Sequence, residues 1–132
     1  MRLGLTMRPP PNPTATGLAA EQAACNFLQQ QGLRLLARNV RYRHGELDLV
    51  MQDGVELVFV EVRYRRSTRY GTSAETITGL KQRRLLHCAQ LYLQQQATLT
   101  QPAYRFDVVT LERTLARCVW HKNAMNWDDA WI

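Results

Sequence analysis

Apolar and polar residues recur along the chain with two different periods, and together they predict seven elements. A period of about 3.6 residues is typical of a helix, and a period of two is typical of a strand. Helical spacing covers residues 17–31, where Ala20, Ala24 and Phe27 recur on one side, and again residues 77–96. Strand patterns cover residues 33–42, 46–52, 55–64, 104–111 and 116–121. The order αβββαββ is typical of one mixed α/β domain.

The second and third predicted strands are joined by Asp53 and Gly54. Asp-Gly between two alternating runs strongly favours a two-residue hairpin turn. Because side chains alternate between the faces of a strand, this turn predicts one face that is wholly apolar. That face would carry Leu47, Leu49, Met51, Val58, Val60 and Val62. We expect a helix to cover it.

The opposite face of the predicted hairpin is apolar near the turn and charged at its far end. With the turn at Asp53 and Gly54, Asp48 would lie opposite Phe59. Glu46 would lie opposite Glu61 on the same face. Asp48 and Glu61 are then diagonal neighbours, with Cβ atoms about 7 Å apart. Two carboxylates so placed repel one another unless positive charge lies between them.

Two kinds of cation could balance these carboxylates. One is an arginine, in an ion pair between Glu61 and either Arg63 or Arg41. The other is a bound Mg²⁺ or Mn²⁺, because hard cations prefer carboxylate oxygens. A metal held by acids and surrounded by phosphate-binding groups is the arrangement that metal-assisted phosphodiester cleavage requires.

Positive charge is concentrated in two short stretches. The net charge is +6, and 15 of the 17 basic residues are arginines. Residues 34–43 hold four arginines and no acid, and residues 63–84 hold seven basic residues and one acid. Arginine binds phosphate in a bidentate manner. The pattern is compatible with a polyanionic partner, most simply nucleic acid, and equally with an ordinary basic surface, so charge alone does not separate the two.

The ends of the chain differ in composition from the middle. Residues 1–15 are rich in proline and predict a flexible tail, followed by a domain over residues 16–121. Residues 122–132 form a short C-terminal tail in which Trp127 and Trp131 could pack back on the domain. No apolar run approaches the roughly 20 residues that span a bilayer, so no membrane segment is expected.

The three cysteines lie far apart and form no C-x-x-C pair, which argues against a zinc site or a disulfide framework. Cys25 and Cys88 lie among apolar residues and are expected to be buried thiols. This cysteine usage is typical of a cytoplasmic protein. His87 lies beside Cys88 on a predicted helix, where neighbours point about 100° apart, so a Cys/His nucleophile is not expected.

The strings GELDL (residues 45–49) and FVEVRYR (residues 59–65) resemble the bacterial YraN-type family. That family belongs to the restriction-endonuclease-like superfamily, with its PD-(D/E)XK signature, and is similar to archaeal Holliday-junction resolvases. Four further motifs match in order and extend the resemblance over residues 16–120. They are Gly17 to Glu21 with Ala24, the N-x-R-x-R of Asn39, Arg41 and Arg43, the K-Q-R-R of residues 81–84, and the R-F-D-V of residues 105–108.

The resemblance implies a restriction-endonuclease-like fold, in which helices flank a central mixed β-sheet. It also implies that Asp48 and Glu61 bind Mg²⁺ or Mn²⁺ and that Glu21 completes the site. Arg63 stands where the family usually has lysine. Arginine keeps the positive charge and can contact phosphate, but it does not readily release a proton.

Two main functions follow from these residues. The first is a metal-dependent nuclease acting on DNA, with branched or structured DNA as a candidate substrate and with Glu21, Asp48, Glu61 and Arg63 at the site. The second is a catalytically silent nucleic-acid-binding module on the same fold. The predicted backbone contacts are Arg41, Arg43, Arg65, Arg66, Lys81, Arg83 and Arg84. A protein-interaction domain with an acidic partner is a third reading, and a homodimer is a candidate assembly because resolvase-like proteins are often dimers.

Two further predictions concern single residues. Asp107 is the one acid in an otherwise apolar strand and is expected to pair with Arg105 or another arginine. Tyr64 and Tyr70 lie among arginines, where they would either stack on unpaired bases or be half-buried aromatic residues.

Overall fold

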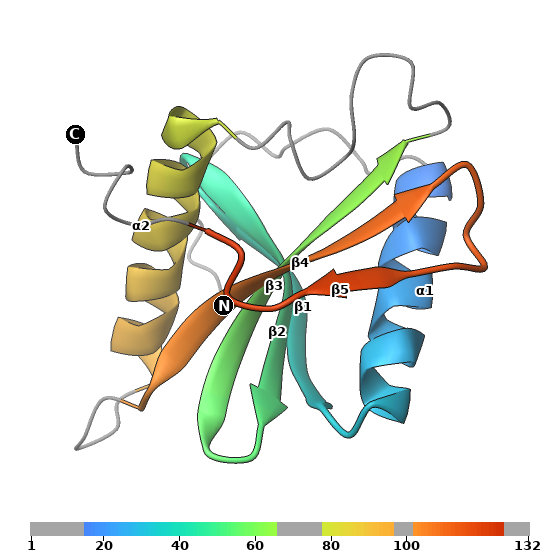
Figure 1. Ribbon diagram of the computed structural model, residues 1–132. Helices are drawn as coiled ribbons and strands as arrows, with labels where there is room; N and C mark the ends of the chain where they lie inside the picture. The colour runs from blue at the N-terminus through green and yellow to red at the C-terminus, as the bar shows by residue number, and fades with distance from the viewer. Residues whose placement is uncertain (1–14, 66–77, 97–101, 126–132) are drawn as a thin grey trace.

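The computed structural model describes residues 15–65, 78–96 and 102–125, which form a five-stranded sheet between two helices (Figure 1). The elements in chain order are α1 (Ala15–Gln30), β1 (Arg34–Tyr42), β2 (Gly45–Asp53), β3 (Glu56–Arg65), α2 (Gly79–Gln95), β4 (Tyr104–Glu112) and β5 (Val119–His121). The predicted order αβββαββ and the central mixed sheet flanked by helices are confirmed. The last strand is shorter than predicted, because only residues 119–121 pair with β4.

The strands lie in the order β1-β2-β3-β4-β5. Three of the four neighbouring pairs are antiparallel, and β3 pairs with β4 in parallel. A parallel pair needs a long crossover connection, and the segment between β3 and β4 contains α2. Figure 1 shows α1 and α2 on opposite faces of the sheet, so each face has its own helical cover.

Two apolar clusters fill the space between the sheet and the helices. On one face, Ala20, Ala24, Cys25 and Leu28 of α1 pack with Leu49, Met51, Val58 and Val60 of the hairpin. On the other, Leu85, Leu86, Cys88 and Ala89 of α2 pack with Leu47, Val50, Phe59 and Phe106. The expected helix over the apolar face is therefore present. Cys25 and Cys88 are buried free thiols, as predicted.

The hairpin turn lies one residue further along the chain than predicted. Asp53 pairs with Glu56, so the two-residue loop is Gly54-Val55. Gly54 has a φ of 64°, which glycine adopts readily. Val55 is 87% exposed, so no buried contact favours its inclusion in the strand. The predicted pairings of Asp48 with Phe59 and of Glu46 with Glu61 are wrong. Phe59 lies opposite Val50 instead.

Gly45 allows β2 to approach α2 closely. A Cβ atom at Gly45 would lie 2.9 Å from Cys88 Sγ, which is too close without movement. We predict that Gly45→Ala destabilises the fold by about 1–3 kcal/mol, the range for overpacked sites. Adding Cys88→Ala should recover part of that loss, because the clashing sulfur is removed.

A chemical-denaturation double-mutant cycle on Gly45→Ala and Cys88→Ala measures this coupling. Purely additive effects of the two substitutions would show that the close approach at Gly45 does not limit packing.

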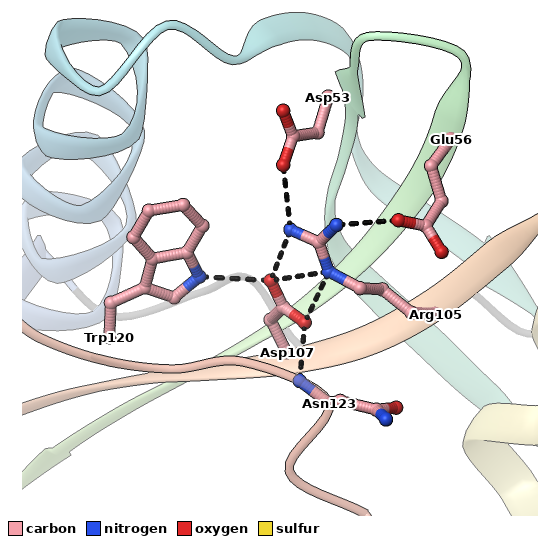
Figure 2. A network of polar contacts seen from close by, with 6 residues as sticks. All are labelled: Asp53, Glu56, Arg105, Asp107, Trp120 and Asn123. Carbon is pink, nitrogen blue, oxygen red and sulfur yellow. Dashed lines mark hydrogen bonds and ion pairs between the residues drawn. The ribbon is translucent and has the colours of Figure 1, made fainter.

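Arg105 and Asp107 of β4 together link the hairpin turn to the segment after β5 (Figure 2). Its guanidinium lies 3.0 Å from Asp107 Oδ1, 2.7 Å from Glu56 Oε1 and 3.0 Å from Asp53 Oδ2. Asp107, which is fully buried, also accepts hydrogen bonds from Trp120 Nε1 and from the backbone N–H of Asn123. The predicted pairing of Asp107 with Arg105 is confirmed, and this network is structural.

Some predictions fall on residues that the structure does not describe. These are the N-terminal tail, the region around Tyr70 and Arg66, and the tryptophans Trp127 and Trp131. Tyr64 is half-buried and packs against the cluster under α1. Among the described helices, none is long and apolar enough to cross a membrane.

Candidate metal centre

The sheet opens between β2 and β3 at the end remote from the hairpin turn. Their backbone pairing runs from Asp53↔Glu56 to Leu49↔Val60 and is not continued further within the described strands. β1 stays paired with β2 as far as Gly45, and β4 stays paired with β3 as far as Arg65. Figure 1 shows β3 and β4 diverging from the β1–β2 pair beyond this point. The fork begins where Asp48 and Glu61 follow the last pair.

Asp48 lies where the alternation of β2 breaks. Leu47 packs in the α2 cluster and Leu49 packs in the α1 cluster, although strict alternation puts both on one face. The predicted placement of Leu47 beside Leu49 is therefore wrong. Asp48 Oδ2 accepts a hydrogen bond of 2.9 Å from the backbone N–H of Val62. The carboxylate thus occupies a position where a backbone carbonyl would otherwise continue the ladder.

Three acids converge beside this fork. Glu21, Glu46 and Asp48 each offer a carboxylate oxygen, and these oxygens all lie within 4.8 Å of one another. All three side chains are half-buried. Two oxygens on opposite sides of Mg²⁺ lie about 4.2 Å apart, because each is about 2.1 Å from the ion. The 4.8 Å limit is close to this span, so a small inward movement of the carboxylates would let them share one hard divalent ion.

Glu21 is brought to the cluster by α1. Burial raises the pKa of Glu21 above its usual range, and the neighbouring Glu46 raises it further, while a hydrogen bond with Asn39 lowers it. Asn39 has a φ of 52°, a left-handed conformation that asparagine tolerates better than most residues. Glu21 Oε1 is buried and has no hydrogen-bond partner among the described residues. A buried carboxylate oxygen without a donor fits a metal ligand.

Asp48 carries the strongest electrostatic perturbation of the cluster. Burial raises the pKa of Asp48 well above its usual range, and the nearby Glu61, Glu21 and Glu46 carboxylates add to this effect. The hydrogen bond from Val62 opposes it. Negative charge is therefore crowded at this point, and a divalent cation would relieve the repulsion.

Glu61 belongs to the same electrostatic environment but has its own cations. It is only 4% exposed, and its Oε2 lies 3.3 Å from Lys81 Nζ and 3.6 Å from Arg63 Nη1. The ion pair with Arg63 that the sequence suggested is therefore present, together with one from α2 that it did not suggest. Glu61 is outside the group of acids within 4.8 Å of one another. Its predicted role as a metal ligand stays a prediction.

The predicted nucleic-acid contacts lie on several elements. Arg41 Nε is 3.8 Å from Glu46 Oε1, and Arg43 is exposed in the turn after β1. Arg65 is half-buried at the end of β3. Arg83 and Arg84 are exposed on α2, two and three residues after Lys81. Arg66 lies outside the described residues.

Glu46 is the member of the cluster that sequence reasoning did not assign to the site. The predicted register had placed it opposite Glu61. In the structure it lies opposite Arg41 in the β1–β2 pair, next to Asp48 and Glu21. The signal available in the sequence was its position two residues before Asp48 in the GELDL string.

Metal binding at this cluster should depend on pH. The raised pKa values of Asp48 and Glu21 mean that the folded protein binds these protons more tightly than the unfolded chain. Without metal, their contribution to stability is largest below the usual carboxyl range and is lost as the pH rises through the raised values. A divalent ion requires the deprotonated carboxylates, so it stabilises mainly above them.

We therefore predict that Mn²⁺ raises the melting temperature at pH 8 and has no effect at pH 4. At a hundredfold excess over Kd the gain is about 2.7 kcal/mol. Thermal melts with Mn²⁺ or with EDTA measure it, and Asp48→Ala should abolish the response. An equal Mn²⁺ shift at both pH values would contradict carboxylate binding.

Comparisons with known proteins identify a group of similar chains. A family model described as "Uncharacterised protein family UPF0102" matches residues 20–111. A UPF0102 protein of Symbiobacterium thermophilum is 55% identical over 96 residues, which are 73% of this chain and 80% of the relative. One from Janthinobacterium is 46% identical over 125 residues, covering 95% and 98% of the two chains. One from Pseudomonas putida is 51% identical over 104 residues, covering 79% and 85%.

Proposed function

Because this chain belongs to the UPF0102 family, the YraN-type family, we propose that it is a metal-dependent nuclease-like protein that hydrolyses phosphodiesters of DNA. The restriction-endonuclease-like superfamily is consistent with the family and with the mixed five-stranded sheet. The observation that carries the proposal is the convergence of Glu21, Glu46 and Asp48 at the fork between β2 and β3.

The proposed site would hold one Mg²⁺ or Mn²⁺ on the oxygens of Glu21, Glu46 and Asp48. The bound ion would polarise a phosphate oxygen and lower the pKa of a water molecule, which are the two effects that metal-assisted hydrolysis uses. The chain's own residues fix the carboxylates in place. The backbone N–H of Val62 holds Asp48, and α1 carries Glu21 to the cluster.

The basic residues around the acids support a polyanionic substrate. Arg41 lies beside Glu46, and Lys81 and Arg63 lie beside Glu61. These cations would attract the phosphates that an isolated acidic cluster would repel. Branched or structured DNA remains the candidate substrate because of the resemblance to resolvases.

DNA binding should be steeply dependent on salt. If about six phosphates are neutralised, log Kd should rise with log salt with a slope of about 5. Fluorescence anisotropy with labelled duplex and four-way-junction DNA in EDTA measures the slope. The same titration is carried out on Arg117→Ala, which removes one exposed arginine outside the proposed contacts. Its salt slope should equal that of the wild type. A Kd for DNA that hardly changes between about 50 and 200 mM salt would argue against the proposal.

A catalytically silent binding module is the second candidate, and Arg63 favours it. The Arg63 side chain is only 19% exposed, and its Nη1 lies 3.6 Å from Glu61 Oε2. It offers a planar fork in place of a compact ammonium group.

One experiment separates the two candidates. The protein is incubated with labelled junction and duplex DNA and Mn²⁺, beside an Asp48→Ala variant and an EDTA control. Cleavage that requires Mn²⁺ and is lost in the variant supports the nuclease. DNA binding without cleavage, unchanged in the variant, supports the silent module.

A further inference from the structure

Glu61 is contacted by two cations that come from different elements. Arg63 is on β3 itself, and Lys81 is on α2. Both approach the same oxygen, Oε2, at 3.6 and 3.3 Å respectively. Their surroundings differ, since the Arg63 side chain is 19% exposed and the Lys81 side chain is 43% exposed. Lys81 is therefore the cation of this pair that a bound molecule can reach more easily.

The backbone of Lys81 is fixed at the start of α2. Thr78 caps the helix, and its Oγ1 accepts a hydrogen bond of 3.1 Å from the N–H of Lys81. One to two turns further along, Arg84 and Cys88 lie against Gly45 at the start of β2. The same helix that carries Lys81 is thus packed directly against the strand that carries Glu46 and Asp48.

The chemistry of the two cations also differs. An ammonium group is compact and has three donors that rotate, whereas a guanidinium is planar and has donors in a fixed fork. The Lys81 ammonium forms an ion pair with Glu61 at 3.3 Å, and even with one N–H directed at that carboxylate it keeps two donors for a phosphate oxygen or for a water molecule. Arg63 lies mostly buried beside Glu61, where the fixed fork has less freedom to turn toward a substrate.

We propose that Lys81, and not Arg63, is the catalytic cation of the site and contacts the scissile phosphate directly. This inference rests on the proposed nuclease function. In the reaction, a water oxygen bonds to phosphorus while the bond from phosphorus to the leaving sugar oxygen breaks. The water loses one proton to solvent, and the leaving oxygen gains one from solvent. Lys81 stays protonated throughout and donates a hydrogen bond to a non-bridging oxygen.

The test compares Lys81→Ala and Lys81→Arg with Lys122→Ala, which removes an exposed lysine that lies over Trp120. Two quantities are measured: the single-turnover rate of DNA cleavage with Mn²⁺, and the salt dependence of DNA binding in EDTA. We expect Lys81→Ala to lower the rate by about 100-fold or more, the usual loss when one donor to the transition state is removed. The salt slope should fall by about 0.9, the value for one phosphate contact. Lys122→Ala should change neither.

Lys81→Arg separates a loss of catalysis from a loss of folding, because it keeps a positive charge beside the buried Glu61. It should melt like the wild type, bind Mn²⁺ equally well, and still cleave at least about tenfold more slowly. A Lys81→Arg protein that cleaves at the wild-type rate would overturn the proposal. A Lys81→Ala protein with the same cleavage rate as the wild type would also overturn it.

Failure of the nuclease function gives a different result. If the wild type binds DNA without cleaving it, the hydrolysis and the catalytic role of Lys81 are both excluded, and a salt slope lowered by Lys81→Ala alone then shows only that Lys81 contacts phosphate. If the wild type shows neither binding nor cleavage, both proposals are overturned.

Discussion

Asp48→Asn is expected to abolish most Mn²⁺-dependent DNA cleavage while leaving the metal-free protein at least as stable as the wild type. Loss of a group that only orients a metal ligand lowers metal affinity or activity by 10- to 100-fold, so loss of a charged ligand should lower cleavage by at least about 100-fold. Stability should not fall, because asparagine retains an oxygen that can accept from the N–H of Val62. It also removes a carboxylate that burial and Glu61 disfavour.

The measurement pairs cleavage rates in Mn²⁺ with melting temperatures in EDTA. Asp53→Asn is the matched control, since it makes the same chemical change at the hairpin turn, in the Arg105 network. A loss of cleavage together with an equal or higher melting temperature would show that Asp48 serves activity at a cost in folding stability. An Asp48→Asn protein that cleaves normally, or one that is clearly destabilised in EDTA, would contradict this account of the site.

Arg105→Met is expected to destabilise the protein by about 3–5 kcal/mol, the range found when one partner of a buried ion pair is removed. Burial alone would lower the pKa of Arg105, but its hydrogen bonds to Asp107, Glu56 and Asp53 raise it overall. Without the guanidinium, the fully buried Asp107 keeps only neutral donors, Trp120 Nε1 and the N–H of Asn123. Those donors do not replace a full positive charge.

Urea denaturation of Arg105→Met, Asp107→Asn and the double variant measures this coupling. The double variant should be more stable than Arg105→Met, because it no longer buries an unpaired carboxylate. Mn²⁺ binding by the folded fraction should be unchanged, since the network lies at the hairpin-turn end of the sheet and the acidic cluster lies at the fork. An Arg105→Met protein within about 1 kcal/mol of the wild type would show that the network is not a main source of stability.

The helices and the hairpin strands could be predicted from the sequence because their buried apolar residues recur at regular spacing. The helices and the strands of the hairpin were found from apolar spacing, and the helix over the apolar face followed from the need to cover it. The register was wrong because Asp-Gly indicates a turn without fixing which two residues form the loop. The observed loop is Gly54-Val55, with Val55 exposed, and the β2–β3 pairing ends at Leu49↔Val60, just before Asp48 and Glu61.

The composition of the acidic cluster could be predicted only in part. Asp48 was recognised from its position in an apolar strand, and Glu21 from the family resemblance. Glu46 was not assigned to the cluster because the predicted register paired it with Glu61, although its position two residues before Asp48 puts both acids on one face. The contact between Lys81 and Glu61 depends on how α2 packs across the sheet, and no local pattern specifies that packing.

An anomalous difference map from crystals soaked in Mn²⁺ shows directly whether Glu21, Glu46 and Asp48 bind a metal ion. We expect one peak at the fork between β2 and β3, about 2.0–2.3 Å from an oxygen of each of Asp48, Glu46 and Glu21. We also expect Lys81 and Arg63 to remain on Glu61. A map without a peak at these oxygens, at Mn²⁺ concentrations that stabilise the protein in solution, would contradict the claim that the acids form a metal centre.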